Sequence, residues 1–150
     1  MREYKFRGKM IPENEWIYGT LLRIPAPPYC WGENPPKDKY YIQFADPRYM
    51  PDWGMSYKMV QGEIKPETIG QYTGLKDKNG IEIYEGDIVK IDVDKAYVKW
   101  NDKYGYFQLA TIGDYYFDSD VIGQALEYAD AEVIGNIYDN KELLEGDENE

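Results

Sequence analysis

The chain has 150 residues, the usual size of one domain, and its 28 acidic and 17 basic side chains give a net charge of −11. It contains no histidine, which excludes Ser-His-Asp triads, histidine metal ligands and the ordinary near-neutral general base. A single cysteine, Cys30, excludes an internal disulfide and a Cys/His zinc site, and it suits a reducing cytoplasm.

The bulk properties also bear on location and partners. Apolar runs are a few residues long, far below the roughly 20 of a membrane span, and the basic start MREYKFRGKM lacks the apolar stretch of a signal peptide. We therefore expect a cytoplasmic protein. The ten residues from Lys141 carry five acids against one lysine, so the remainder of the chain is acidic as well. Such a field repels nucleic acid phosphates, which disfavours DNA or RNA as a partner.

The N-terminal part of the chain predicts three strands. Tyrosine and tryptophan favour half-buried pleated surfaces, and the chain contains 16 and 4 of them. Polar and apolar side chains alternate in the first of these strands. The strands are predicted over Glu3–Arg7, Glu15–Leu22 and Tyr40–Phe44.

Basic side chains gather at the first strand. We expect them to lie on its solvent side. The alternative is a local basic patch that binds nucleic acid together with Tyr4 and Phe6. The residues concerned are Arg2, Lys5, Arg7 and Lys9.

Two irregular segments carry the candidate binding residues. Arg23–Lys39 holds five of the nine prolines, so it predicts a long loop of polyproline II character rather than a central strand. Asp46–Ser56 predicts a second long loop. Aromatic rings in such loops are hard to bury and make strong anchors, because they bring a large area at low rotamer cost. The alternative is that these rings fold back as a lid. The candidate partner-binding residues are Tyr29, Trp31, Tyr49 and Trp53.

The second half of the chain predicts an antiparallel sheet. Gly turns at Lys76–Gly80 and Glu85–Asp87 precede an alternating strand over Ile88–Val93. A turn at Asp94-Lys95 is expected to join this strand to the next. Further strands are predicted over Ala96–Trp100, Tyr104–Ile112 and Val133–Tyr138, and the side chains expected in the core are Val89, Ile91, Val93, Ala96, Val98 and Trp100.

Short helical segments are expected at two places. Val121–Tyr128 predicts one or two helical turns, and Asn140–Leu144 predicts a terminal helix with Asn140 as its N-cap. An Ile-Gly-Gln/Asn triplet recurs three times, and its glycines predict bulges or tight bends rather than a ligand site. The triplets begin at Ile69, Ile122 and Ile134.

The segment Gly70–Ile91, GQYTGLKDKNGIEIYEGDIVKI, resembles the signature of the YopX family of small phage and prophage proteins. MREYKFRGKM, EWIYGTLL, AYVKW and AEVIGNIYDNKELL resemble further parts of that family, so the resemblance covers most of the chain outside Arg23–Lys65. It implies a β-rich fold whose C-terminal half is an SH3-like barrel, and a phage or bacterial setting. It implies no established activity and no catalytic residues.

Pattern and resemblance together predict an all-β fold with one or two short helices. A single domain is expected over residues 1–145. Its N-terminal strands and Pro-rich loops occupy 1–66, and the SH3-like barrel with its hairpins occupies 67–145. An acidic, disordered tail is expected over 146–150.

No catalytic constellation is recognisable in the sequence. P-loop and dinucleotide-binding fingerprints are absent, and the only serines, Ser56 and Ser119, lack a nucleophile-elbow context. Cys30, beside Trp31, is expected to be a small packed residue rather than a nucleophile. We therefore expect no enzymatic activity and no cofactor.

An acidic segment at 118–120 invites comparison with a calcium loop. It fails as an EF-hand, because Ile122 and Ala129 stand where ligands belong. A weak cation site formed with Asp114 stays open at this point, although no metal is expected.

The leading hypothesis is a phage- or prophage-encoded, non-catalytic interaction module that binds a protein partner in the host cytoplasm. An alternative is an acidic DNA mimic that inhibits a host nucleic-acid-handling protein, suggested by the net charge. Two further alternatives are nucleic acid binding by the basic first strand and hydrolysis by paired carboxylates. Homo-oligomerisation also stays open, because many aromatic side chains have to be buried from solvent.

Overall fold

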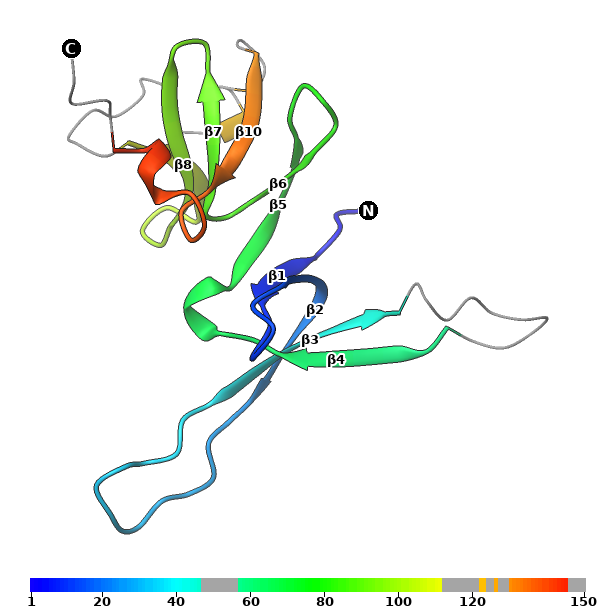
Figure 1. Cartoon of the computed structure of the whole chain (residues 1–150), viewed down its shortest axis with the longest axis vertical. Helices are drawn as coiled ribbons and strands as arrows, with labels where there is room; N and C mark the ends of the chain where they lie inside the picture. Colours follow the sequence, from blue (N-terminus) through cyan, green and yellow to red (C-terminus); the bar gives the residue numbers. More distant parts are fainter. Residues whose placement is uncertain (47–56, 112–121, 124–125, 127–129, 146–150) are drawn as a thin grey trace. The chain divides into compact units, whose positions relative to one another are not determined.

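The computed structural model describes residues 1–46, 57–111, 122–123, 126 and 130–145. These residues form mainly antiparallel strands (Figure 1), which confirms the all-β class. In the described part of the chain, no helix has the length and apolar character to cross a membrane. The elements are β1 (Phe6–Lys9), β2 (Trp16–Ile24), β3 (Lys39–Ala45), β4 (Met59–Glu63), η1 (Pro66–Thr68), β5 (Gly70–Lys76), β6 (Glu82–Tyr84), β7 (Asp87–Ile91), β8 (Asp94–Asn101), β9 (Tyr106–Ala110), β10 (Ala131–Asn136) and η2 (Lys141–Leu143).

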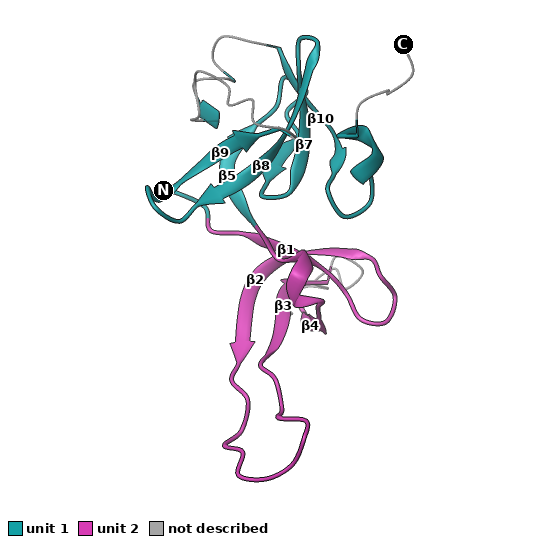
Figure 2. Cartoon of the chain, turned by 90° about the vertical axis from the view of Figure 1, so that its left-hand side faces the viewer, with its two compact units in different colours: residues 1–3, 71–150 teal, residues 4–70 magenta. Residues whose placement is uncertain are grey.

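The chain divides into two compact units (Figure 2). The N-terminal unit comprises residues 4–70, and the C-terminal unit comprises residues 1–3 and 71–150. The boundary lies close to the expected division between 66 and 67. A single domain over 1–145 stays a prediction, and the expected tail at 146–150 lies outside the described residues.

The N-terminal unit is built on the strand order β4-β3-β2-β1, with antiparallel neighbours. Ile42 on β3 and Ile64 after β4 are almost completely buried. The 3-10 turn η1 is fixed to β1, since the backbone N–H of Lys9 donates to the Thr68 hydroxyl at 2.8 Å. The sequence analysis did not predict β4, because its short Gln-Gly stretch has no clear alternation.

The basic side chains of β1 are not arranged as expected. Arg7 and Lys9 are only 5% and 8% exposed. Strand pairing sets Lys9 opposite Trp16, and the two cationic groups lie 4.6 and 5.5 Å from the centroid of that ring. The aromatic face attracts the charges and covers their aliphatic stems. The prediction that Arg7 and Lys9 face solvent is therefore wrong, and the basic patch loses two of its four members.

The C-terminal unit contains a four-stranded sheet in the order β10-β7-β8-β9 and the antiparallel pair β5–β6, which is not part of that sheet. Its core includes the predicted side chains of β7 and β8, with Trp100 packed half-buried against the edge of Phe107. Val93 is instead 87% exposed. The turn falls at Asp92-Val93 and not at Asp94-Lys95, because Asp92 adopts a φ of 54° that ends β7 at Ile91.

The expected barrel is not confirmed. Strand β10 pairs with β7, so β9 and β10 are opposite edges of the sheet, and no sheet closes among the described strands. Strand β10 shifts register between Val133 and Gly135. This shift confirms the bulge that the third Ile-Gly-Asn triplet predicts.

The turn before β7 joins several strands of the C-terminal unit. Gly86 adopts a φ of 86°, its N–H donates to the Val98 carbonyl at 2.8 Å, and its own carbonyl accepts the Ile137 N–H at 2.9 Å. A side chain at this position would meet the ring of Tyr138. Gly86 therefore satisfies both the backbone conformation and the close packing.

The helical predictions are met only in part. Ile122, Gly123 and Leu126 are helical, and the rest of 121–128 lies outside the described residues. The terminal segment forms the single 3-10 turn η2, and Asn140 does not cap it with its side chain. The Asn140 amide oxygen instead accepts the Asn136 N–H at 3.4 Å. Asn140 therefore occupies the predicted N-cap position, but its side chain makes no capping hydrogen bond.

A buried carboxylate connects the β5–β6 turn to β10. One oxygen of Asp77 accepts the N–H groups of Asn79 and Ile81 at 2.8 and 2.9 Å, and the other accepts the Val133 N–H at 3.0 Å. Burial by itself raises the pKa of Asp77, but the three backbone hydrogen bonds outweigh it, so the pKa lies below its ordinary value.

Asp77→Ala is expected to lower the free energy of unfolding by about 3 kcal/mol, because three backbone donors lose their acceptor. Chemical denaturation measures this change. Asp102→Ala is the matched control, since it removes an exposed carboxylate of the same unit. Equal stability of the two variants would show that the Asp77 network contributes nothing.

The Asp77 contribution also depends on pH with a defined sign. The pKa is lower in the folded protein than in the unfolded chain. The stabilisation is therefore complete above the unfolded-state value of about 3.9 and is lost as the pH falls through the folded-state value. Unfolding curves recorded down this range should converge for the wild type and Asp77→Ala.

Candidate functional site

The connection between β2 and β3 is an exposed segment of the N-terminal unit. Figure 2 shows this loop, which we call the arm (residues Pro25–Asp38), running away from the strands of its unit. The arm contains no regular helix or strand, and nearly all of its residues are exposed. The predicted long loop is therefore confirmed as an extension of the β2–β3 hairpin.

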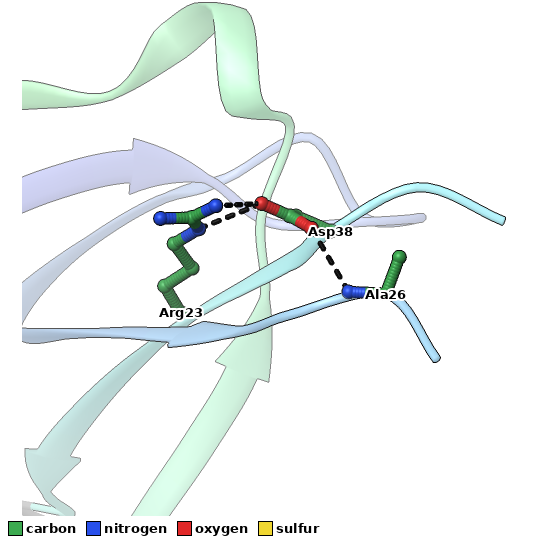
Figure 3. A network of polar contacts seen from close by, with 3 residues as sticks. All are labelled: Arg23, Ala26 and Asp38. Carbon is green, nitrogen blue, oxygen red and sulfur yellow. Dashed lines mark hydrogen bonds and ion pairs between the residues drawn. The ribbon is translucent and has the colours of Figure 1, made fainter. Parts of the chain in front are cut away.

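A network of polar contacts closes the base of the arm (Figure 3). Asp38 Oδ2 accepts the Nε–H of Arg23 at 2.6 Å and lies 2.5 Å from its Nη2. Asp38 Oδ1 accepts the backbone N–H of Ala26 at 2.9 Å. The carboxylate thus holds the outgoing and returning chains together, and we call this group of three residues the clamp.

The contacts within the clamp shift the pKa values of both of its charged groups. The Ala26 N–H and then the Arg23 guanidinium lower the pKa of Asp38 below its ordinary value. The same contact with Asp38 raises the pKa of Arg23. Because the clamp is solvent-exposed, its stabilising effect on the whole fold is small. Its main effect is local, since it fixes how the arm leaves the sheet.

The tip of the arm presents one large ring to solvent. Gly32 adopts a φ of 116°, and a side chain here would collide with the Tyr29 hydroxyl, so the tip requires glycine. Tyr29 lies against this turn and is 43% exposed, whereas Trp31 is 89% exposed. Cys30 between them is also exposed. The arm therefore exposes the Trp31 ring to solvent.

The described part of the C-terminal unit contains a small charged hollow. A hollow of about 130 Å³ is lined only by charged side chains, two of which, Lys78 and Glu132, form an ion pair at 3.6 Å. In the ranges that the structure describes, no three His, Cys, Asp or Glu side chains gather to hold a metal ion. The residues lining the hollow are Lys78, Lys90, Asp92, Asp130 and Glu132.

Comparison with known proteins agrees with the sequence resemblance. The model of the YopX protein family matches residues 5–145, nearly the whole chain. The chain belongs to the YopX family. No curated protein matches it. Among solved structures, it is similar to protein EF1440 from Enterococcus faecalis, with 24% sequence identity, a TM-score of 0.47, and coverage of 96% of this chain and 99% of that chain.

In this YopX-family protein, two of the four predicted binding residues lie together. Tyr29 and Trp31 share the tip of the arm, and their exposure is contrary to the lid alternative for these two rings. Tyr49 and Trp53 lie outside the described residues, as does the cation-site candidate at 114–120. Cys30 is exposed, so the prediction that it is a packed residue is wrong, because the arm has no core around it.

The sequence analysis missed the clamp of this YopX-family protein. Arg23 and Asp38 stand at the two ends of the Pro-rich segment and have opposite charges. That flanking pair was the available signal. Sequence alone could not show that the strand register brings the ends together, or that Ala26 supplies the second donor.

Asp38→Ala is expected to loosen the arm without unfolding the protein. Loss of the acceptor should speed hydrogen exchange of the Ala26 amide about five- to tenfold, and should speed proteolytic cleavage within the arm. Amide exchange measured by NMR tests this effect. Acidification should likewise lower the protection of the Ala26 amide relative to its intrinsic exchange rate, since the Asp38 contact holds above its ordinary pKa and is lost as the pH falls through the lowered folded-state value.

The matched control is Glu33→Ala, which removes an exposed carboxylate from the same arm. It should leave exchange at Ala26 unchanged. If Asp38→Ala and Glu33→Ala behave alike, the clamp does not order the arm.

Proposed function

We propose that this YopX-family protein is a phage- or prophage-encoded, non-catalytic interaction module, acting in the cytoplasm of a bacterial host, whose arm binds a protein partner. The observation that carries the proposal is the 89% exposure of Trp31 at the tip of a clamped, Pro-rich arm. Tyr29 supports the same site, and Tyr49 and Trp53 remain candidates from sequence alone.

Binding through the arm would combine a large contact area with a small loss of conformational entropy. Tryptophan brings a large contact area with few rotatable bonds, and it is enriched among the residues that dominate binding energy. Prolines and the clamp restrict the arm before any partner arrives. A restricted loop loses less conformational entropy on binding, so more of the contact energy appears as affinity.

A non-catalytic role also fits the chemistry of the chain. The sequence lacks histidine, and its one cysteine lies on the exposed arm. One hollow among the described residues of the C-terminal unit, about 130 Å³, is smaller than the roughly 300–1,000 Å³ of typical small-molecule pockets. These features favour recognition over bond-making.

Trp31→Ala is expected to abolish retention of the partner from a host lysate by the immobilised full-length chain. The loss should amount to at least about tenfold in affinity once the partner is purified, as for a central aromatic anchor. Thermal unfolding should be unchanged, because the side chain is almost fully exposed. Trp53→Ala tests the second loop in the same way.

Tyr104→Ala is the matched control for this experiment, since it removes an exposed ring from the C-terminal unit. Proteins retained by the wild type and by Tyr104→Ala but lost with Trp31→Ala would be partners of the arm. Retention that is insensitive to Trp31→Ala contradicts the proposal.

A second candidate function is favoured by the distribution of charge between the units. Residues 4–70 contain nine basic and eight acidic side chains, whereas residues 71–150 contain seven basic and nineteen acidic ones. The net negative charge is thus confined to the C-terminal unit. Such segregation suits a mimic of nucleic acid phosphates that occupies the basic surface of a host nucleic-acid-handling protein.

This alternative predicts binding of a different kind. Affinity should fall steeply between about 50 and 200 mM salt, and it should persist in Trp31→Ala. It should also weaken when three exposed acids of the C-terminal unit, Asp92, Asp94 and Asp102, are replaced by asparagine. Replacement of three exposed acids of the N-terminal unit by glutamine, at Glu13, Glu15 and Glu33, is the matched control. Salt-independent binding would exclude the mimic.

A further inference from the structure

Three prolines bias the outgoing half of the arm toward an extended conformation. Pro25, Pro27 and Pro28 follow directly after β2, and each ring holds its φ near −65°. The residue before each proline is excluded from the helical region. Ile24 to Pro28 therefore favours polyproline II geometry, and this stretch continues into the exposed tip.

The outgoing half of the arm is exposed except at Ala26. A polyproline II helix has three residues per turn, so Pro25 and Pro28 lie on one edge. Trp31 follows at the same interval in the sequence, and all three are exposed, as is Pro27 on a further edge. Ala26 belongs to another edge, is partly buried, and donates its N–H to Asp38 at 2.9 Å. The clamp thus holds one edge of the segment and leaves the proline edge open to solvent.

The charge of the arm restricts the kind of partner. Between Ile24 and Lys37 the only charged side chains are Glu33 and Lys37, and Arg23 and Asp38 neutralise each other in the clamp. The arm is therefore close to neutral in a protein of net charge −11. Its complement is an uncharged, aromatic surface rather than a basic one. Aromatic surfaces of this kind recognise polyproline II segments in proteins.

We propose that Pro25, Pro28 and Trp31 form a polyproline II edge that docks in an aromatic-lined groove of the partner protein. This inference rests on the proposed function and specifies its chemistry. The prolines fill the shallow pockets between aromatic rings, and Trp31 adds a large contact at the end of the edge. The clamp presents the edge already extended, so little ordering accompanies docking.

The test uses the full-length chain and a panel of purified SH3 and WW domains as probes, each paired with a variant whose groove tryptophan is replaced by alanine. At least one probe should bind the chain saturably and its groove variant should not. The double variant Pro25→Ala/Pro28→Ala should weaken binding about tenfold, the scale of losing central contacts. Pro35→Ala/Pro36→Ala, on the returning half of the same arm, should change it less than about twofold.

Three outcomes would overturn the inference. One is that no probe binds better than its groove variant. Another is that the two double proline variants lose affinity equally, since the effect would then come from arm stiffness alone. The third is Trp31-dependent binding to vesicles of neutral phosphatidylcholine without binding to any probe, which would assign the arm to a membrane surface.

The same variants separate this inference from the proposed function. If host proteins are lost with Trp31→Ala but retained by Pro25→Ala/Pro28→Ala, the arm binds a partner through its ring and the polyproline edge is refuted. If Trp31→Ala changes neither lysate retention nor probe binding, the proposed function fails as well.

Discussion

The carboxylate of Asp38 joins the two segments of the chain that enter and leave the arm. Asp38 holds Arg23 with one oxygen and the Ala26 N–H with the other, at the point where β2 and β3 separate. This bridge ties the outgoing and returning ends of the arm together. An exposed ion pair adds little to global stability, but here it restricts a local equilibrium. That restriction is the structural basis of the proposed recognition role.

The protein uses acidic side chains repeatedly as acceptors for backbone donors. Asp77 binds three amide groups between the β5–β6 turn and β10, and Asp87 accepts the Tyr84 N–H at 2.8 Å. Both are buried. Part of the acidity of the C-terminal unit is therefore structural, because these carboxylates satisfy turns that would otherwise bury unpaired donors. Only the exposed remainder is available for an electrostatic partner.

The sequence predicted the parts of the fold that local chemistry decides. Alternation placed Val89, Ile91, Ala96 and Val98 in the core, and proline content placed the arm outside the sheet. The sequence analysis failed where a residue's environment depends on residues that are distant in the chain. Arg7 and Lys9 look like solvent-facing charges in any alternating strand, and only pairing with β2 brings Trp16 under them. Likewise, the alternating pattern predicts a strand that extends to Val93. The positive φ of Asp92 instead ends β7 at Ile91.

The candidate site divides in the same way. Its anchors, Tyr29 and Trp31, could be chosen from sequence, because bulky rings between prolines are hard to bury. The clamp could not, because it requires the register of β2 with β3. The sequence by itself therefore determined the strand-rich class, the family and the exposed character of the arm, all of which follow from residue type and order. The tertiary structure decided how the sheets pair, which charges are buried and how the arm is fixed, because hydrogen bonds between distant residues depend on register, and register is set by the packing of the whole sheet.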